Sequence, residues 1–240
     1  MVVLLFASYE LFVTDWLSAL KQREATADLE DQWSNPRGTI DRPLEGDGIA
    51  KLHIPSFGPD FDFTVLQGTG QDVLAVGPGH YVDTAMPGQP GNFALAGHRV
   101  GHGSPFNDLD LLESCDALVV ETRDTWFVYR MLPTAGEVAG WSTGKGATPQ
   151  CRGVAPLPPP YPEVPGRKIV MPWQGEVIEP VPGAPESLVP PEQRAPLITL
   201  TTCHPRFSAE KRLIIHGVLV GQHPKTGPES GWSPAELVAS

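Results

Sequence analysis

The chain is organised around Thr199-Leu200-Thr201-Thr202-Cys203, with Arg212 nine residues further on. Residues 197–202 are apolar and β-branched, which predicts a strand that ends at Cys203. Residues 213–220 form a second apolar run, so antiparallel pairing would put Cys203 and Arg212 at neighbouring strand ends. Because side chains alternate along a strand, Thr199, Thr201 and Cys203 are expected on one face. A thiol near a guanidinium suggests a nucleophile beside an anion-stabilising group.

A third candidate, His98, ends the strand-like run Asn92-Phe93-Ala94-Leu95-Ala96-Gly97-His98. With a period of two, Phe93 and Leu95 face the core, while Ala94, Ala96 and His98 share the other face. The two alanines leave room for an extended peptide, so both are candidate substrate-binding residues. Thr201 and Thr202 are candidates for the same role, because they would shape that groove or supply backbone donors.

Each of these residues also has a simpler interpretation. A cysteine at the end of a strand is usually a small buried hydrophobe, and a single His or Arg there is seldom catalytic. Together, in this order and at strand ends, the three favour catalysis. His204 is a rival base, although strand alternation should aim it away from Cys203. His216 is expected to be a rim or core residue.

Three motifs together resemble the sortases, the cysteine transpeptidases that attach surface proteins to the bacterial cell wall. They are T-L-x-T-C at residues 199–203, R-L-I-I-H-G from Arg212, and G-N-F-A-L-A-G-H-R at residues 91–99. The likeness covers roughly residues 48–222, apart from one insertion. The flanking residues 77–81 and 90–94 are most similar to the class E, actinobacterial branch.

This resemblance implies an all-β fold: a closed, mostly antiparallel barrel of about eight strands, with short helices and an N-terminal helix. It implies His98, Cys203 and Arg212 as catalytic residues. Cys203 would form a thioester by cleaving a C-terminal sorting signal of the LAxTG or LPxTG kind between Thr and Gly. Arg212 would stabilise the oxyanion. A protonated His98 would favour the thiolate and protonate the departing amine.

The resemblance also implies the partners. These are the sorting-signal peptides of exported proteins and an acceptor amine, either a peptidoglycan precursor or a pilin lysine. Two other functions remain open: a thiol-dependent peptidase, and a non-catalytic surface β-barrel that binds peptide or glycan. An intact set of His, Cys and Arg argues against the second.

The ends of the chain differ from its centre. Residues 1–13 are apolar except Ser8, Tyr9 and Glu10, but they are too few to span a bilayer alone. We interpret them as a partial membrane anchor, the alternative being an amphipathic helix packed on the domain. Residues 14–33 are helix-prone with a thin apolar stripe, which predicts a solvated stalk within a stalk and linker at 14–47. The catalytic domain then spans 48–222 and a polar tail 223–240, expected to be poorly ordered. The membrane would hold the catalytic domain on its extracytoplasmic side.

Residues 144–196 form the insertion. Fourteen of the 27 prolines fall between Pro149 and Pro196, which predicts an irregular or polyproline-like segment. One hairpin is expected within it, between residues 168–171 and 176–178. A solvated linker and a lid over the groove are both open interpretations.

Composition limits the ligands. The net charge is −11 and the 17 Lys and Arg are scattered, so no nucleic-acid partner is expected. The three cysteines leave two possibilities: Cys115 pairs with Cys151, or both are unpaired. His98 and His102 have the spacing of a helical zinc pair, but the glycines beside His102 argue against a helix. No metal and no cofactor is expected.

Overall fold

The computed structural model describes residues 14–35, 42–159, 161–184, 189–225 and 233–238. Its strands are β1 (Gly48–His53), β2 (Asp62–Gln67), β3 (Gly79–His80), β4 (Gly91–Ala96), β5 (Ala117–Glu121), β6 (Thr125–Met131), β7 (Arg167–Val170), β8 (Pro196–His204) and β9 (Lys211–Pro224). The α-helices are α2 (Thr14–Ser34), α3 (Gln71–Leu74) and α4 (Ala235–Val238). Short 3₁₀ segments are η2 (Pro55–Phe57), η3 (Leu109–Leu111), η4 (Trp141–Thr143), η5 (Lys145–Ala147), η6 (Pro149–Cys151), η7 (Gly175–Ile178) and η9 (Pro191–Gln193).

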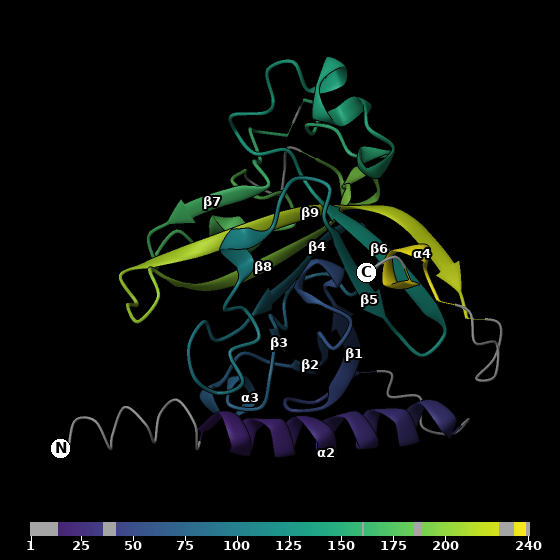
Figure 1. Ribbon diagram of the computed structural model, residues 1–240, viewed down its shortest axis with the longest axis vertical. Coiled ribbons are helices and arrows are strands. Elements are labelled where there is room, and N and C mark those ends of the chain that lie inside the picture. The colour runs from purple at the N-terminus through teal and green to yellow at the C-terminus, as the bar shows by residue number, and fades with distance from the viewer. Residues whose placement is uncertain (1–13, 36–41, 160, 185–188, 226–232, 239–240) are drawn as a thin grey trace.

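Eight of these strands close into a barrel in the order β6-β5-β1-β2-β3-β4-β8-β9, because β9 pairs back with β6 (Figure 1). The ninth strand, β7, adds to the exposed edge of β9 next to β6. Among the described strands only the pairs β2–β3 and β4–β8 are parallel. The closed, mostly antiparallel barrel predicted from the sequence is therefore confirmed.

The three strands β4, β8 and β9 contribute alternate residues to the barrel core. These inward residues are Phe93 and Leu95 of β4, Ile198 and Leu200 of β8, and Leu213 and Ile215 of β9. The residues between them point outward, because side chains alternate along a strand. Thr199, Thr201 and Cys203 therefore share the outer face of β8.

Helix α2 lies against the barrel at the end opposite the insertion (Figure 1). The Gln22 side chain donates a hydrogen bond to the Thr64 carbonyl (3.0 Å) and accepts one from the Thr64 N–H (2.9 Å). β3 pairs with β2 only at Leu66 and Gln67, so Thr64 has no strand partner on that edge of β2. The side chain of Gln22 bonds the backbone of Thr64 in place of the missing strand. The helix expected over residues 14–33 is present, but the expectation of a free, solvated stalk is wrong.

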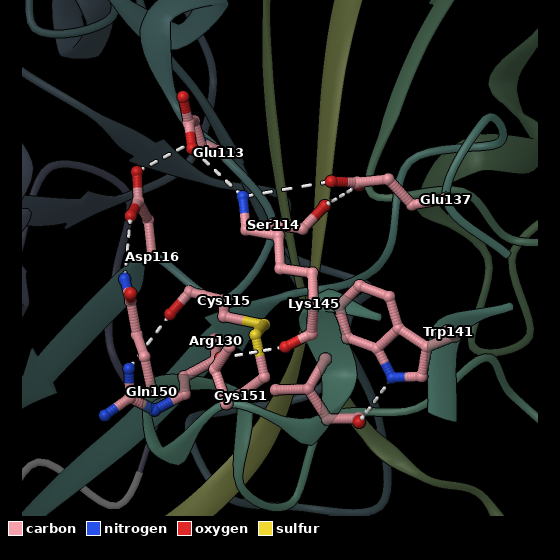
Figure 2. The surroundings of a disulfide bond; sticks show 12 residues. Glu113, Ser114, Cys115, Asp116, Arg130, Glu137, Trp141, Lys145, Gln150 and Cys151 are labelled. Atoms are coloured by element: carbon pink, nitrogen blue, oxygen red, sulfur yellow. Dashed lines mark hydrogen bonds and ion pairs between the residues drawn. A yellow bond between two sulfur atoms is a disulfide. The ribbon is translucent and has the colours of Figure 1, made fainter. Parts of the chain in front are cut away.

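The first part of the insertion is attached to the barrel by a disulfide. Cys151 in η6 is bonded to Cys115, which decides between the two possibilities that the sequence left open (Figure 2). The indole N–H of Trp141 donates to the carbonyl of Val154 (3.0 Å), and both side chains pack against the disulfide. This part of the insertion therefore has a small buried core of its own.

The second part of the insertion pairs with the barrel, so the hairpin expected within it is wrong. β7 pairs with β9, where Val170 lies opposite Arg212. Residues 175–178 form the turn η7, whose Val177 packs with Ile214 of β9. The physical reason is that β6 covers β9 only from Gly217 onward, which leaves the preceding edge of β9 open for β7.

The tail also differs from the expectation. β9 extends to Pro224, and residues 233–238 return to the barrel, where Glu236 pairs with Arg130 at 2.7 Å. The described part of the tail is thus packed on the domain. Among the described helices, none is long and apolar enough to cross a membrane. The expected anchor, residues 1–13, lies outside the described residues.

Candidate active site

Two strand pairings bring His98, Cys203 and Arg212 to one end of the barrel. β8 and β9 pair so that Arg212 lies directly opposite Cys203. β4 and β8 run parallel, with Ala96 beside Thr201. The pairing continues beyond β4, because the N–H of Gly97 donates to the carbonyl of Thr201 (3.1 Å). The same register, continued by two residues, puts His98 beside Cys203. Residues opposite one another on neighbouring strands point to the same face, so all three side chains belong to the outer face.

Cys203 is the free thiol of the chain, since the other two cysteines form the disulfide. Its side chain is half-buried, as are those of His98 and Arg212. The Nη1 atom of Arg212 donates to the carbonyls of Ala209 and Lys211, both at 3.0 Å. The loop between β8 and β9 therefore holds one amino group of the guanidinium at the end of the strand pair.

His98 is biased toward its neutral form. Burial lowers the pKa of the His98 imidazole, and the charge of His102 lowers it further. The rings of the two histidines lie 4.8 Å apart, measured between centroids. This direction is opposite to the protonated His98 that we expected beside the thiol. A neutral imidazole can accept a proton, which makes His98 better suited to act first as a base.

The four candidate substrate-binding residues divide into two groups. Ala94, Ala96 and Thr201 lie on the outer face with Cys203, and all three are buried. Thr202 points to the other face, where its hydroxyl donates to the Gly97 carbonyl at 2.8 Å. Thr202 therefore ties β8 to the chain just before His98 and does not lie along the outer face.

Tyr81 lies over this face and was not among the expected site residues. It follows β3, and its N–H donates to the carbonyl of Ala94 (3.0 Å). Its hydroxyl lies 3.1 Å from Oγ1 of Thr201. Because β3 and β8 flank β4 on opposite sides, the Tyr81 side chain crosses the face of β4. Small side chains at Ala94 and Ala96 leave room for that crossing. The sequence contained Tyr81 only within the 77–81 flank, where no periodic pattern indicated its role.

Comparison with known proteins gives the family. The sortase domain model of protein families matches residues 52–220. This chain belongs to the sortase family. Sortase SrtE1 of Streptomyces coelicolor is 32% identical over 231 residues, which is 93% of this chain and 55% of that protein. This sortase chain thus spans about half the length of that relative. Sortase SrtE2 of the same organism is 29% identical, over 90% of this chain and 76% of that protein.

Solved structures agree with this assignment. The SrtF sortase from Corynebacterium diphtheriae has a TM-score of 0.67 at 38% identity, covering 85% of this chain and 97% of that one. Sortase E from Streptomyces avermitilis has a TM-score of 0.56 at 31% identity, covering 81% and 99%. The resemblance to the class E branch, predicted from the flanking motifs, is confirmed by these relatives.

Arg99 of this sortase follows His98 and points the other way, into the protein. Its side chain is only 3% exposed. Nη1 lies 3.5 Å from the Cys203 carbonyl and donates to Nδ1 of His204 at 2.8 Å, while Nη2 lies 2.9 Å from a carboxylate oxygen of Asp110. Arg99 therefore joins the chain after His98 to the end of β8. The sequence placed it in the G-H-R motif but assigned it no role.

The rival base His204 faces away from Cys203, as strand alternation predicted. Arg99 can only donate hydrogen bonds, so Nδ1 of His204 must be an acceptor. Burial and then the charge of Arg99 lower the pKa of His204, which keeps the ring neutral. His204, which is half-buried at the end of β8, is thus held by its hydrogen bond with Arg99.

His216 belongs to a buried chain of hydrogen bonds further along the outer face. The Thr199 hydroxyl donates to Oδ1 of Asn92 (2.8 Å) and lies 2.8 Å from Nδ1 of His216. Since its one proton is used, it must accept a hydrogen bond from Nδ1–H of His216. The Asn92 amide donates to the carbonyls of Val177 and Glu179. This chain of hydrogen bonds attaches the insertion to the outer face of the sortase barrel.

The insertion consequently covers part of the face that carries Cys203. Val177 and Val170 pack on Ile214. Ile214 is the next outward-facing residue of β9 after Arg212. Beyond Ile214 the face becomes partly exposed at Cys203 and Arg212. Among the described residues, the linker interpretation of this part is wrong, because it is fixed by buried side chains and by strand pairing.

Proposed function

We propose that this protein is a cysteine transpeptidase that cleaves a C-terminal sorting signal between Thr and Gly and transfers the surface protein to a cell-wall amine. The signal would be of the LAxTG or LPxTG kind. The observation that supports this most is the strand register, in which Arg212 lies directly opposite the free thiol of Cys203. The pairing of β4 with β8, extended two residues beyond Ala96 and Thr201, leads to His98 beside the same thiol. The family assignment supports the same activity.

In the first half of the reaction, the sulfur of Cys203 attacks the carbonyl carbon of the threonine. The thiol proton passes to the neutral imidazole of His98. The guanidinium of Arg212 donates hydrogen bonds to the oxyanion of the tetrahedral intermediate. When the carbon–nitrogen bond breaks, His98 returns the proton to the departing glycine amine, and a thioester remains on Cys203.

In the second half, an amine resolves the thioester. The incoming amine attacks the thioester carbonyl and gives its proton to His98, while Arg212 again stabilises the oxyanion. Collapse of the intermediate forms an amide and releases the sulfur, which recovers its proton from His98. The acceptor would be a peptidoglycan-precursor amine, or a pilin lysine if the enzyme builds pili.

The extended peptide would lie along the outer face of β4 and β8. Tyr81 and Thr201 would contact it near Cys203, because the hydroxyls of both residues meet over this face. Ala94 and Ala96 would act indirectly, because their small side chains leave room for the Tyr81 ring over β4. The turn η7 packs on Ile214 of the outer face, and it would limit how far the bound peptide extends along that face from Cys203.

The disulfide supports a location outside the cytoplasm. Bonds such as that between Cys115 and Cys151 form and persist mainly in oxidising compartments. We infer that the catalytic domain works on the extracytoplasmic side of the cell membrane, with residues 1–13 as part of a membrane anchor.

A transfer assay tests the proposal. The purified protein is incubated with an LAxTG peptide and a glycine-based amine, and the products are identified by mass spectrometry. We expect an amide product from the wild-type protein and none from Cys203→Ala. Arg212→Ala should lower the rate by roughly 10²–10³-fold, as loss of an oxyanion donor typically does.

Two results would favour the other functions. Release of free acid without amide, even at high amine concentration, would indicate a thiol-dependent peptidase. Binding of the peptide with no product, unchanged in Cys203→Ala, would indicate a non-catalytic barrel. Iodoacetamide should label Cys203 in the native wild-type protein, which verifies that the thiol is accessible.

A further inference from the structure

The loop that follows His98 has an unusual backbone. Gly101 and Gly103 adopt left-handed conformations with φ of 68° and 74°, and so do the non-glycine residues His102 (54°) and Ser104 (43°). Left-handed backbone is uncommon for residues with a side chain. Such conformations persist where the surrounding structure holds them and are frequent near functional sites.

His102 makes the side-chain contact that links this loop to His98. The two rings lie 4.8 Å apart with their planes 32° from parallel. The loop is closed at its far end by Phe106, whose N–H donates to the carbonyl of His98 at 3.0 Å. The imidazole of His102 is therefore folded back onto the imidazole of His98.

The first turn of α2 holds the middle of the same loop. The Asp15 carboxylate accepts a hydrogen bond from the N–H of Gly103 at 2.9 Å, and Thr14 Oγ1 lies 3.5 Å from the N–H of His102. The rest of α2 is attached to the barrel separately, through Gln22 and through Ser18, whose hydroxyl donates to the Ala75 carbonyl at 2.7 Å. A helix fixed at those points presents Asp15 to the loop as a rigid support.

We propose that His102 is a positioning residue for the imidazole of His98, and that the first turn of α2 holds His102 in place. The proposal rests on the proposed function, in which the reacting proton passes through His98. His102 contacts neither the peptide nor the sulfur in this scheme. It fixes the ring of His98 by contact, and Asp15 fixes the backbone of His102 and Gly103.

Two pairs of variants test the proposal in the transfer assay. His102→Asn removes the ring but keeps a residue that tolerates left-handed backbone, and His102→Phe restores an aromatic ring. Asp15→Ala removes the acceptor for the Gly103 N–H, and Asp15→Asn keeps an acceptor oxygen. Asp28→Ala, the same change at an exposed position of α2, is the control.

We expect His102→Asn to lower kcat roughly 10–100-fold with little change in KM, because a displacement of about 1 Å can cost a factor of 10². Asp15→Ala should lower kcat less, by about tenfold. Asp15→Asn should recover most of the loss. His102→Phe should recover part of it, because phenylalanine restores the ring but tolerates left-handed backbone less well than histidine. Wild-type kcat in His102→Asn would overturn the proposal. If Asp15→Ala matched Asp28→Ala, the part that assigns support to α2 would be overturned.

An NMR titration of His98 gives a readout that does not depend on turnover. Because the charge of His102 lowers the pKa of His98, the titration midpoint of His98 should rise in His102→Asn and stay unchanged in Asp28→Ala. The titratable or charged groups that share the outer face with His98 are Cys203 on β8 and Arg212 on β9, and His102 contacts it from its own loop, whereas Arg99 and His204 point away. A midpoint that does not move in His102→Asn would contradict the contact.

The two readouts separate the two proposals. Wild-type protein that transfers no peptide would refute the proposed function, while the titration would still report whether His102 acts on His98. If His102→Asn does not fold, as judged by its thermal unfolding, Asp15→Ala and Asp15→Asn decide the matter by the same measurements.

Discussion

Helix α2 and the insertion at residues 144–196 both cover the barrel, but different interactions hold them. The buried residues of α2 are Thr14, Ser18, Gln22 and Leu29, three of them polar. The insertion buries mostly apolar side chains and adds a disulfide and the strand β7. The regular helix is thus fixed mainly by hydrogen bonds of polar side chains, whereas the irregular segment adds apolar burial, a disulfide and strand pairing to its hydrogen bonds with Asn92. In this chain, how regular a segment is does not predict how firmly it is attached to the barrel.

The largest effect should come from the covalent link of the insertion. Replacing Cys115 and Cys151 together by Ala removes the constraint on a loop with a sequence separation of 36. We expect the free energy of unfolding to fall by about 3–4 kcal/mol, measured by urea denaturation. Cys203→Ala is the control for loss of a thiol outside the bond. A double variant as stable as that control would show that packing around Trp141 alone holds the insertion.

Acid should weaken the insertion through His216. Burial, and then the charge of Lys168, lower the pKa of His216 to about 3, compared with about 6.5 for an unfolded histidine. Because the folded pKa is the lower one, the unfolded state binds the proton first as the pH falls. Stability is therefore lost between these two values, by about 2 kcal/mol from this group at pH 5.

The measurement for His216 is the loss of unfolding free energy between pH 7 and pH 5. It should be smaller in His216→Gln than in the wild-type protein. Hydrogen-exchange protection factors, which correct for the intrinsic exchange rate at each pH, should fall more between pH 7 and pH 5 in residues 175–178 than in α2, which contains no histidine. An equal loss of protection in both regions would contradict the proposed difference between them.

A smaller effect is expected where α2 is attached. Gln22→Ala leaves the N–H and the carbonyl of Thr64 without their side-chain partner. An unsatisfied buried group costs about 1–3 kcal/mol, and access of water to the freed groups should keep the loss near 1–2 kcal/mol. Thermal unfolding measures it, with Gln32→Ala on the same helix as the control. If Gln22→Ala and Gln32→Ala were equally stable, α2 would not depend on these hydrogen bonds.

The smallest effect should come from the ion pairs around the disulfide. Lys145 lies 3.0 Å from Glu113, whose side chain is 74% exposed (Figure 2). Exposed pairs contribute at most about 1 kcal/mol, so Lys145→Ala should change the free energy of unfolding by less than that. The difference should shrink further in 1 M salt. A larger loss would mean that charge, rather than burial, holds the insertion.

Some features of the fold were predictable because their signals are local. The alternation around Thr199 and Cys203 predicted the faces of β8, and the run ending at His98 predicted β4. Helix propensity predicted α2. The position of α2 was not predictable, because it depends on Gln22 meeting Thr64, two residues that no periodic pattern connects.

For the insertion, the sequence predicted the local backbone but not the packing partners. Proline content predicted its irregular backbone correctly, but composition carries no information on what an irregular segment packs against. The partner of β7 was missed because the open edge of β9 exists only after the barrel closes at Gly217. In the candidate site, Arg99 and Tyr81 were missed for a similar reason, since each acts through a neighbour on another strand.

The length of β9 has a consequence for how activity arises during synthesis. This strand pairs with β6, β7 and β8 and also carries Arg212, yet it is the last strand of the barrel to leave the ribosome. Contacts between distant segments form late, because closing long loops costs entropy before those contacts form. A nascent chain that already contains His98 and Cys203 still lacks the strand that seals the barrel. We therefore expect catalytic competence to appear only after β9 has been synthesised and has left the ribosome.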